Sequence, residues 1–174
     1  MKFNRIVALI MALMLSTFCF AAFAEDEYPI HEPILLSGME LTAAEWLADG
    51  DTRALFSLLL QLEMAIYEEE YHMGEYLEVY GLPTQYVAIN DSDPAFTFLE
   101  VFYFFNDGVN GVMVVGLYMP DYGMFNGFVM DYAGDPVAMM ESFLEGGSIT
   151  GYYEITLDEM YNAYVLVDSV INGN

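Results

Sequence analysis

Three apolar segments separated by short polar turns dominate the middle of the chain. They are Phe96–Phe105, Val112–Met119 and Phe125–Tyr132, each rich in Phe, Val, Tyr or Met. Such runs favour pleated strands. The polar residues at 106–111 and the Pro-Asp-Tyr-Gly sequence at 120–123 supply the residue types that tight turns require. The pattern therefore predicts a three-stranded antiparallel meander near residues 96–132.

Apolar residues line both faces of these predicted strands. In the first segment, one face carries Phe96, Phe98, Glu100, Phe102 and Phe104, and the other carries Thr97, Leu99, Val101, Tyr103 and Phe105. A strand with one solvated face would alternate apolar and polar residues instead. Both sheet faces are therefore expected to be covered, by helices or by a partner. Gly116 and Gly127 interrupt the later segments and mark bulges or positions where another backbone comes close.

Helical patterns precede the meander. Thr42 and Glu45 form a capping box that predicts the start of a short helix. A second helix, capped by Asp51 or Thr52, is apolar nearly all round as far as Tyr67. Such a helix should be buried against more than one neighbour, and it is the expected cover for one face of the sheet.

Two further helices follow the meander. An Asp-Pro pair at 135–136 provides a cap and a first helical residue for a helix through Leu144. Its expected buried residues are Val137, Met140 and Leu144. A second capping box, formed by Thr156 and Glu159, begins the last helix. The apolar residues of that helix fall on one stripe, made of Leu157, Met160, Tyr161, Tyr164, Val167 and Ile171.

Shorter stretches complete the prediction. Residues 68–78 continue the long helix or begin another across Gly74. Residues 84–90 predict a first, edge strand, and residues 152–155 predict a short one. Together these elements predict an α+β fold, in which an antiparallel three- to four-stranded sheet, with its meander near 96–132, is covered by N-terminal and C-terminal helices.

The first 24 residues predict a signal peptide. A positive start and an apolar run precede an Ala-Phe-Ala sequence at 22–24, which fits the cleavage pattern of exported proteins. An uncleaved anchor is the alternative. Cleavage would also remove Cys19, the only cysteine. The mature chain could then form neither a disulfide nor a thiolate metal site. We expect residues 25–40 to form an acidic, extended lead-in and residues 41–174 to form a single globular domain.

The exported chain would carry an extreme charge. Lys2 and Arg5 lie in the predicted signal peptide, which leaves Arg53 as the one Lys or Arg against 27 Asp and Glu, a formal net charge of −26 with His neutral. That field repels nucleic acid and anionic lipid headgroups, and it suits cationic proteins, peptides or metal ions. It also keeps a chain rich in Phe, Tyr and Met soluble. Crowded carboxylates should have raised pKa values in the folded state.

A few residues suggest chemistry. Glu68, His72 and Glu75 fall at i, i+4 and i+7, so on one helix they would form a carboxylate–imidazole ladder able to bind a divalent cation. A solvated acidic helix face explains the same spacing. Arg53 is either part of a structural ion pair or a ligand for an anionic substrate group. Trp46, the only tryptophan, is either a core anchor or a stacking platform for a sugar or a base.

The sequence contains no motif of a nucleophilic or phosphate-binding enzyme: neither Gly-x-Ser-x-Gly nor a Gly-rich phosphate loop is present. It therefore favours an exported, non-catalytic module that binds a protein or peptide, and it implies no cofactor other than a divalent cation. A divalent-cation-binding protein is the first alternative. A small hydrolase built on paired carboxylates is the second, but 27 acidic residues produce such pairs by chance.

Export generates a direct prediction. If residues 1–24 are a signal peptide, mass spectrometry of the exported protein should place its N-terminus within a few residues of Glu25. A folded, exported product that retains Met1 would contradict the prediction.

Overall fold

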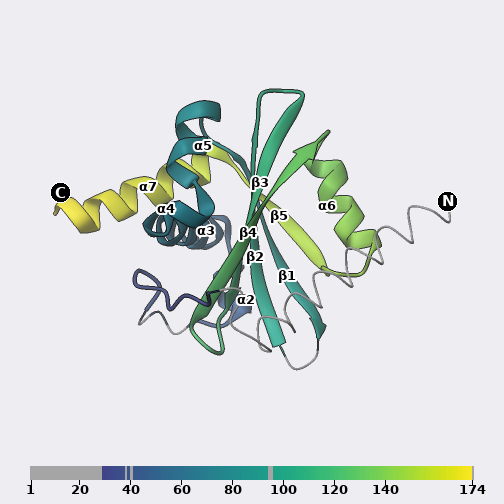
Figure 1. Ribbon diagram of the computed structural model, residues 1–174. Coiled ribbons are helices and arrows are strands. Elements are labelled where there is room, and N and C mark those ends of the chain that lie inside the picture. Colours follow the sequence, from purple (N-terminus) through teal and green to yellow (C-terminus); the bar gives the residue numbers. More distant parts are fainter. Residues whose placement is uncertain (1–28, 38, 40, 94–95, 174) are drawn as a thin grey trace.

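The structure, a computed structural model, describes residues 29–37, 39, 41–93 and 96–173. Its centre is a five-stranded antiparallel sheet in the order β4-β3-β2-β1-β5 (Figure 1). The strands are β1 (Thr84–Asp93), β2 (Phe96–Asn106), β3 (Asn110–Met119), β4 (Met124–Ala133) and β5 (Gly151–Ile155). The predicted α+β class and antiparallel sheet are confirmed, with five strands rather than three or four. The predicted signal peptide lies outside the described residues.

The meander prediction is confirmed, because β2, β3 and β4 are successive antiparallel neighbours. The prediction that β1 is an edge strand is wrong. β5 pairs along its other side, with Gln85 opposite Ile155 and Ile89 opposite Gly151, so β1 is an interior strand. Val87 in its middle is fully buried. β5 reaches this position only after the chain has crossed the sheet, and a local pattern does not encode such a long-range pairing.

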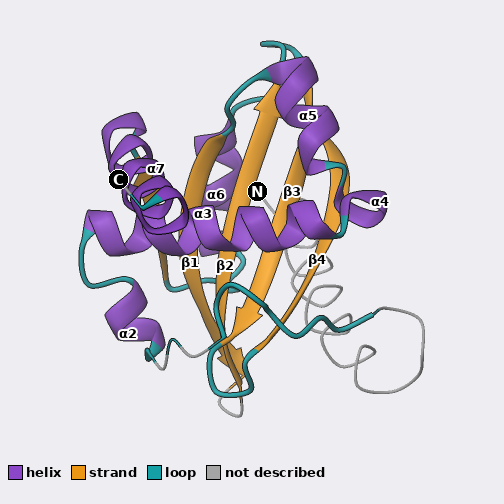
Figure 2. Ribbon diagram, turned by 90° about the vertical axis from the view of Figure 1, so that its left-hand side faces the viewer, coloured by secondary structure: helices purple, strands orange, loops and turns teal. Residues whose placement is uncertain are grey.

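The helices of the described residues are α2 (Ala43–Trp46), α3 (Gly50–Ile66), α4 (Glu68–Tyr71), α5 (Met73–Tyr80), α6 (Pro136–Glu145) and α7 (Leu157–Asn172). Figures 1 and 2 show α3, α4, α5 and α7 on one side of the sheet and α6 on the other. One hydrophobic cluster joins α3 to the odd-numbered residues of β2, and a second joins α6 to even-numbered ones. None of the helices in this part of the chain is long and apolar enough to cross a bilayer.

Side-chain caps begin several of these helices. Both predicted capping boxes are formed, with Thr42 as the cap of α2 and Thr156 as the cap of α7. The cap of α3 is Asp49, not Asp51 or Thr52 as predicted. Asp49 has an extended backbone, and its carboxylate accepts the N–H of Thr52 at 2.8 Å. An extended residue ahead of the first turn is the geometry that capping requires, whereas residues inside the helix cannot provide it.

The buried faces of α6 and α7 match the predicted ones only in part. In α6, Met140 is buried as predicted and Leu144 is partly buried against the core, but Val137 is exposed and Phe143 is buried as well. In α7, Met160 and Val167 pack against the core. The other members of the predicted stripe are exposed: Leu157, Tyr161, Tyr164 and Ile171. Helical periodicity identifies residues on one side of a helix, but it does not show how far the neighbouring elements extend along that side.

Residues 29–37, part of the segment predicted as an acidic, extended lead-in, pack against the fold. His31 pairs with Phe125 of β4 through two backbone hydrogen bonds of 2.9 Å. Its ring lies 3.8 Å from that of Tyr67, between centroids, and its Nε2 lies 3.0 Å from Glu70 Oε2. The segment is thus extended only in its first part, since residues 34–37 form bends and a turn, and His31 holds it against the edge of the sheet and the end of α3.

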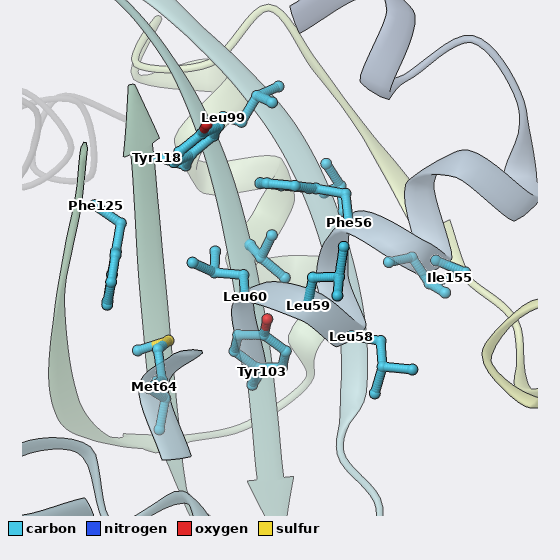
Figure 3. Close-up of a cluster of buried hydrophobic side chains, with 14 of the residues drawn as sticks. Phe56, Leu58, Leu59, Leu60, Met64, Leu99, Tyr103, Tyr118, Phe125 and Ile155 are labelled. Carbon is cyan, nitrogen blue, oxygen red and sulfur yellow. The ribbon is translucent and has the colours of Figure 1, made fainter. Parts of the chain in front are cut away.

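Two glycines allow α3 to lie directly on the sheet. Gly116 of β3 is paired with Gly127 of β4. A Cβ atom on Gly116 would lie 2.6 Å from Leu60 Cδ2, and one on Gly127 would lie 2.9 Å from Met64 Cε. Both α3 side chains belong to the buried cluster drawn in Figure 3. These glycines therefore mark a close approach between helix and sheet, one of the two roles that the sequence predicted.

Substitution of Gly116 by Ala tests this close approach. The added methyl group overlaps Leu60, so we expect the free energy of unfolding to fall by about 1–3 kcal/mol in urea titrations. Gly151→Ala is the matched control, because nothing lies within 4 Å of its added Cβ. The control should change stability by about 0.5 kcal/mol or less. Equal losses in both variants would contradict the packing described for α3.

Candidate functional site

The three residues of the predicted metal ladder do not lie on one helix. The chain leaves the helical conformation at Tyr67, and His72 has a left-handed backbone (φ 52°, ψ 31°) that ends α4 and precedes α5. Glu68 accepts the backbone N–H groups of Gly74 at 2.9 Å and Glu75 at 3.1 Å. Its carboxylate therefore satisfies the free donors at the start of α5. The sequence left open a continuous helix or a second one that begins across Gly74; the structure places the break at His72, two residues before that glycine.

His72 and Glu75 nevertheless remain neighbours, with 3.6 Å between Nδ1 and Oε2, and both are exposed. Within residues 29–37, 39, 41–93 and 96–173, no group of three or more His, Cys, Asp or Glu side chains is placed to hold a metal ion. The prediction of a divalent-cation site assumed that these residues share one helix, and the structure does not show that geometry.

Arg53, in the first turn of α3, connects four parts of the fold. Its Nη1 donates a hydrogen bond of 3.1 Å to the carbonyl of Leu47. Its Nη2 lies 4.0 Å from Glu159 Oε1 of α7, and its guanidinium carbon lies 4.5 Å from the ring centroid of Tyr153 in β5. The side chain is 17% exposed. Carbonyl, carboxylate and aromatic face together hold the guanidinium inside the structure.

Removing this cation tests its structural role. Arg53→Met loses the charged hydrogen bond and the contact with Tyr153, so we expect the free energy of unfolding to fall by about 2–3 kcal/mol. Arg53→Lys keeps the charge but not the planar group, and its loss should be smaller. The measurement is urea unfolding of the three proteins. A loss near zero for Arg53→Met would instead leave Arg53 available for a ligand.

Trp46, the second candidate from the sequence, is fully buried in the core between α2 and α3. Its ring centroid lies 5.2 Å from that of Phe56. A side chain with no exposed surface cannot stack on an external sugar or base. Trp46 is therefore a core residue.

Exposed apolar side chains gather on α7. We call these residues, which extend around the helix on both sides of its packed stripe, the α7 outer face: Leu157, Tyr161, Tyr164, Val165, Leu166, Val170 and Ile171. Each is between 47% and 77% exposed. The C-terminal turns of α7 extend away from the sheet beyond α3 (Figure 1), and Figure 2 shows α7 nearly end-on where it meets α3. The sequence identified four of these residues as an apolar stripe but not their exposure.

The N-terminal end of α7 is fixed to α3. Glu159 lies so close to Gly50 that a Cβ atom on that glycine would overlap its carboxylate. Ala163 is buried one turn further on. The helix is thus held by contacts as far as Val167, and these contacts leave the α7 outer face exposed to solvent.

Two acidic residues are buried, which the sequence did not predict. Glu63 of α3 has no exposed surface, and it accepts the backbone N–H groups of Leu35 and Leu36. Glu100 of β2 is 2% exposed and accepts a hydrogen bond of 2.8 Å from Asn90 Nδ2. Burial raises the pKa of Glu100 to about 7, and the hydrogen bond from Asn90 partly opposes that rise. The sequence offered one sign of this burial. Glu63 falls within the apolar part of the predicted long helix, and Glu100 falls between apolar residues on one face of the first predicted strand.

Several exposed carboxylates show the opposite behaviour. Hydrogen bonds from Thr42 lower the pKa of Glu45, and hydrogen bonds from Thr52 lower that of Asp49. The turn residue Asp107 has a lowered pKa because backbone N–H groups donate to it. Crowding of carboxylates was expected to raise pKa values, but at these positions the only opposing effect is burial, and local hydrogen bonding outweighs it.

A shallow depression of about 340 Å³ lies between the β2–β3 turn and the start of α6. It is lined by Asn106, Gly108, Val109, Asn110, Tyr132, Gly134, Asp135 and Pro136. Its polar groups are already used within the fold, because Asn106 donates to the hydroxyl of Tyr132 and Asp135 caps α6. These bonds leave few groups to recognise a small ligand.

Comparison of the chain with known protein families, with curated proteins and with solved structures finds no match. Functional inference therefore depends on the geometry described above.

Proposed function

We propose that this protein is an exported, non-catalytic interaction module that binds a cationic helical segment of a partner through the α7 outer face. The observation that supports this most strongly is the exposure of seven apolar side chains on one projecting helix. Large apolar side chains left exposed together on one helix commonly mark a site of association. Tyr161 and Tyr164 add aromatic groups of the kind enriched at protein interfaces.

Charge favours a cationic partner. α7 carries Asp158, Glu159 and Asp168 and no basic residue. Arg53, the nearest cation, already lies beside Glu159 and Tyr153. The full chain has a formal net charge of −24, so a second copy would approach the surface against electrostatic repulsion, whereas a basic amphipathic segment would be attracted.

A synthetic peptide tests this proposal. The probe is a fluorescently labelled amphipathic 18-residue helix made of Leu and Lys, and a Leu/Glu helix of the same pattern is its negative counterpart. Fluorescence anisotropy should show binding of the Lys peptide, weakening as salt rises from 0.05 to 0.5 M. Replacing Val170 and Ile171 by Gln should weaken binding about tenfold or more, because the apolar contact area is removed.

The matched control replaces two exposed apolar residues away from α7, Val79 and Leu82, by Gln. Its affinity for the Lys peptide should equal that of the unmodified protein. Equal binding of the Leu/Glu peptide, or unchanged affinity in the α7 variant, would contradict the proposal. A dimer that forms in light scattering and is lost in the Val170 and Ile171 variant would identify a second copy as the occupant instead.

A further inference from the structure

Glu100 lies in the middle of β2, the central strand, on the face of the sheet that α6 covers. Phe102 and Phe104 are on the same face, and the cross-strand neighbours of Glu100 are Ala88 of β1 and Leu117 of β3. Its surroundings are thus almost wholly apolar. A carboxyl group removed from water in this way must be paired with a cation or favour its neutral form.

No cationic side chain of the described residues lies on this face. Arg53, His31 and His72 are all on the α3 side of the sheet, where each has an acidic neighbour. The hydrogen bond from Asn90 to Glu100 supplies a neutral donor and no charge. An ionised Glu100 would therefore be a buried anion without a counterion among the described residues.

The other titratable groups on this side of the sheet carry negative charge or none. They are Tyr86, Tyr132, Tyr152, Asp135 and Glu154, together with Glu141 and Glu145 on α6. None of them can stabilise an anion at Glu100 by attraction. The pKa of about 7 at Glu100 follows chiefly from its burial.

We propose that Glu100 makes the packing of α6 on the sheet pH-dependent: the neutral carboxyl keeps this layer closed, and the ionised carboxylate loosens it. α6 has ten residues and buries two large side chains, Met140 and Phe143. The ring of Phe143 lies 5.3 Å from that of Phe102, two residues from Glu100, so α6 covers this part of β2. Displacing α6 admits water to Glu100 and leaves the α3 layer intact.

The sign of the effect follows from the pKa. Glu100 has a pKa of about 7 when closed and about 4.5 when exposed to water. Between these two values, Glu100 keeps its proton in the closed state but has lost it in the open state. Opening therefore releases a proton, and raising the pH favours it. Between about pH 5.5 and pH 8.5 the opening equilibrium should rise roughly thirtyfold. The inference is independent of the proposed function, because α7 lies on the opposite side of the sheet.

Hydrogen exchange measured by mass spectrometry at pH 5.5 and 8.5, corrected for the intrinsic exchange rate, tests this inference. Protection of residues 137–149 should fall roughly thirtyfold as the pH rises, while protection of α3 changes little. Glu100→Gln should abolish the pH dependence. Glu141→Gln is the matched control, since it removes the same charge from an exposed position on α6 and should behave like the unmodified protein.

A second variant covers the case in which Glu100→Gln does not fold. Asn90→Ala removes a donor that favours the carboxylate and so raises the closed-state pKa of Glu100 further, while the open-state pKa is unchanged. The loss of protection between pH 5.5 and pH 8.5 should therefore exceed roughly thirtyfold in this variant. Unchanged pH dependence in Glu100→Gln, or a loss in Asn90→Ala no larger than in the unmodified protein, would overturn the inference. Equal loss of protection in α3 and α6 would overturn it as well, because the opening would then be global rather than confined to α6.

Discussion

Packing of α3 against the middle of the sheet is the contact on which the other parts of the structure depend. Gly116 and Gly127 bring Leu60 and Met64 close to the sheet backbone. The hydroxyl of Tyr103 donates to the carbonyl of Ser57 in α3 at 2.7 Å within the same contact, so this buried hydroxyl has a partner. The α2 helix, α7 and the segment before α2 then pack against α3 rather than against the sheet alone.

An acidic chain with few cations must stabilise its carboxylates by other means. The carboxylates of Glu45, Asp49 and Asp107 accept hydrogen bonds from N–H groups at helix starts and in a turn. These bonds favour the charged form and so lower the three pKa values. A lowered folded-state pKa contributes stability at neutral pH that is lost on acidification. Glu100 has the opposite sign, because it is buried with a neutral donor and loses stability as the pH rises. In this protein, neutral hydrogen-bond donors thus stabilise carboxylates that Lys and Arg side chains stabilise in most proteins.

Sequence reasoning identified parts of the candidate sites but not their environments. Arg53 was recognisable as an unusual cation, whereas its contact with Tyr153 depends on β5 lying beside β1. The spacing of Glu68 and Glu75 was correct along the chain, but a left-handed residue at His72 separates them into two helices. The apolar stripe of α7 was visible as well. Its exposure was not, since that depends on α7 meeting the start of α3 and extending beyond it (Figure 1).

The sequence by itself determined the local structure: the strands of the meander, their turns, and the capping boxes at Thr42 and Thr156. These features depend on interactions within a few residues, so the residue types are sufficient to predict them. The tertiary structure decided that β5 joins β1, that Glu63 and Glu100 are buried, and that the outer face of α7 is not. Each of these depends on which distant segments meet. Apolar periodicity indicates which face of a helix or strand is suited to burial. Packing between distant segments determines which of these faces are buried in the folded protein.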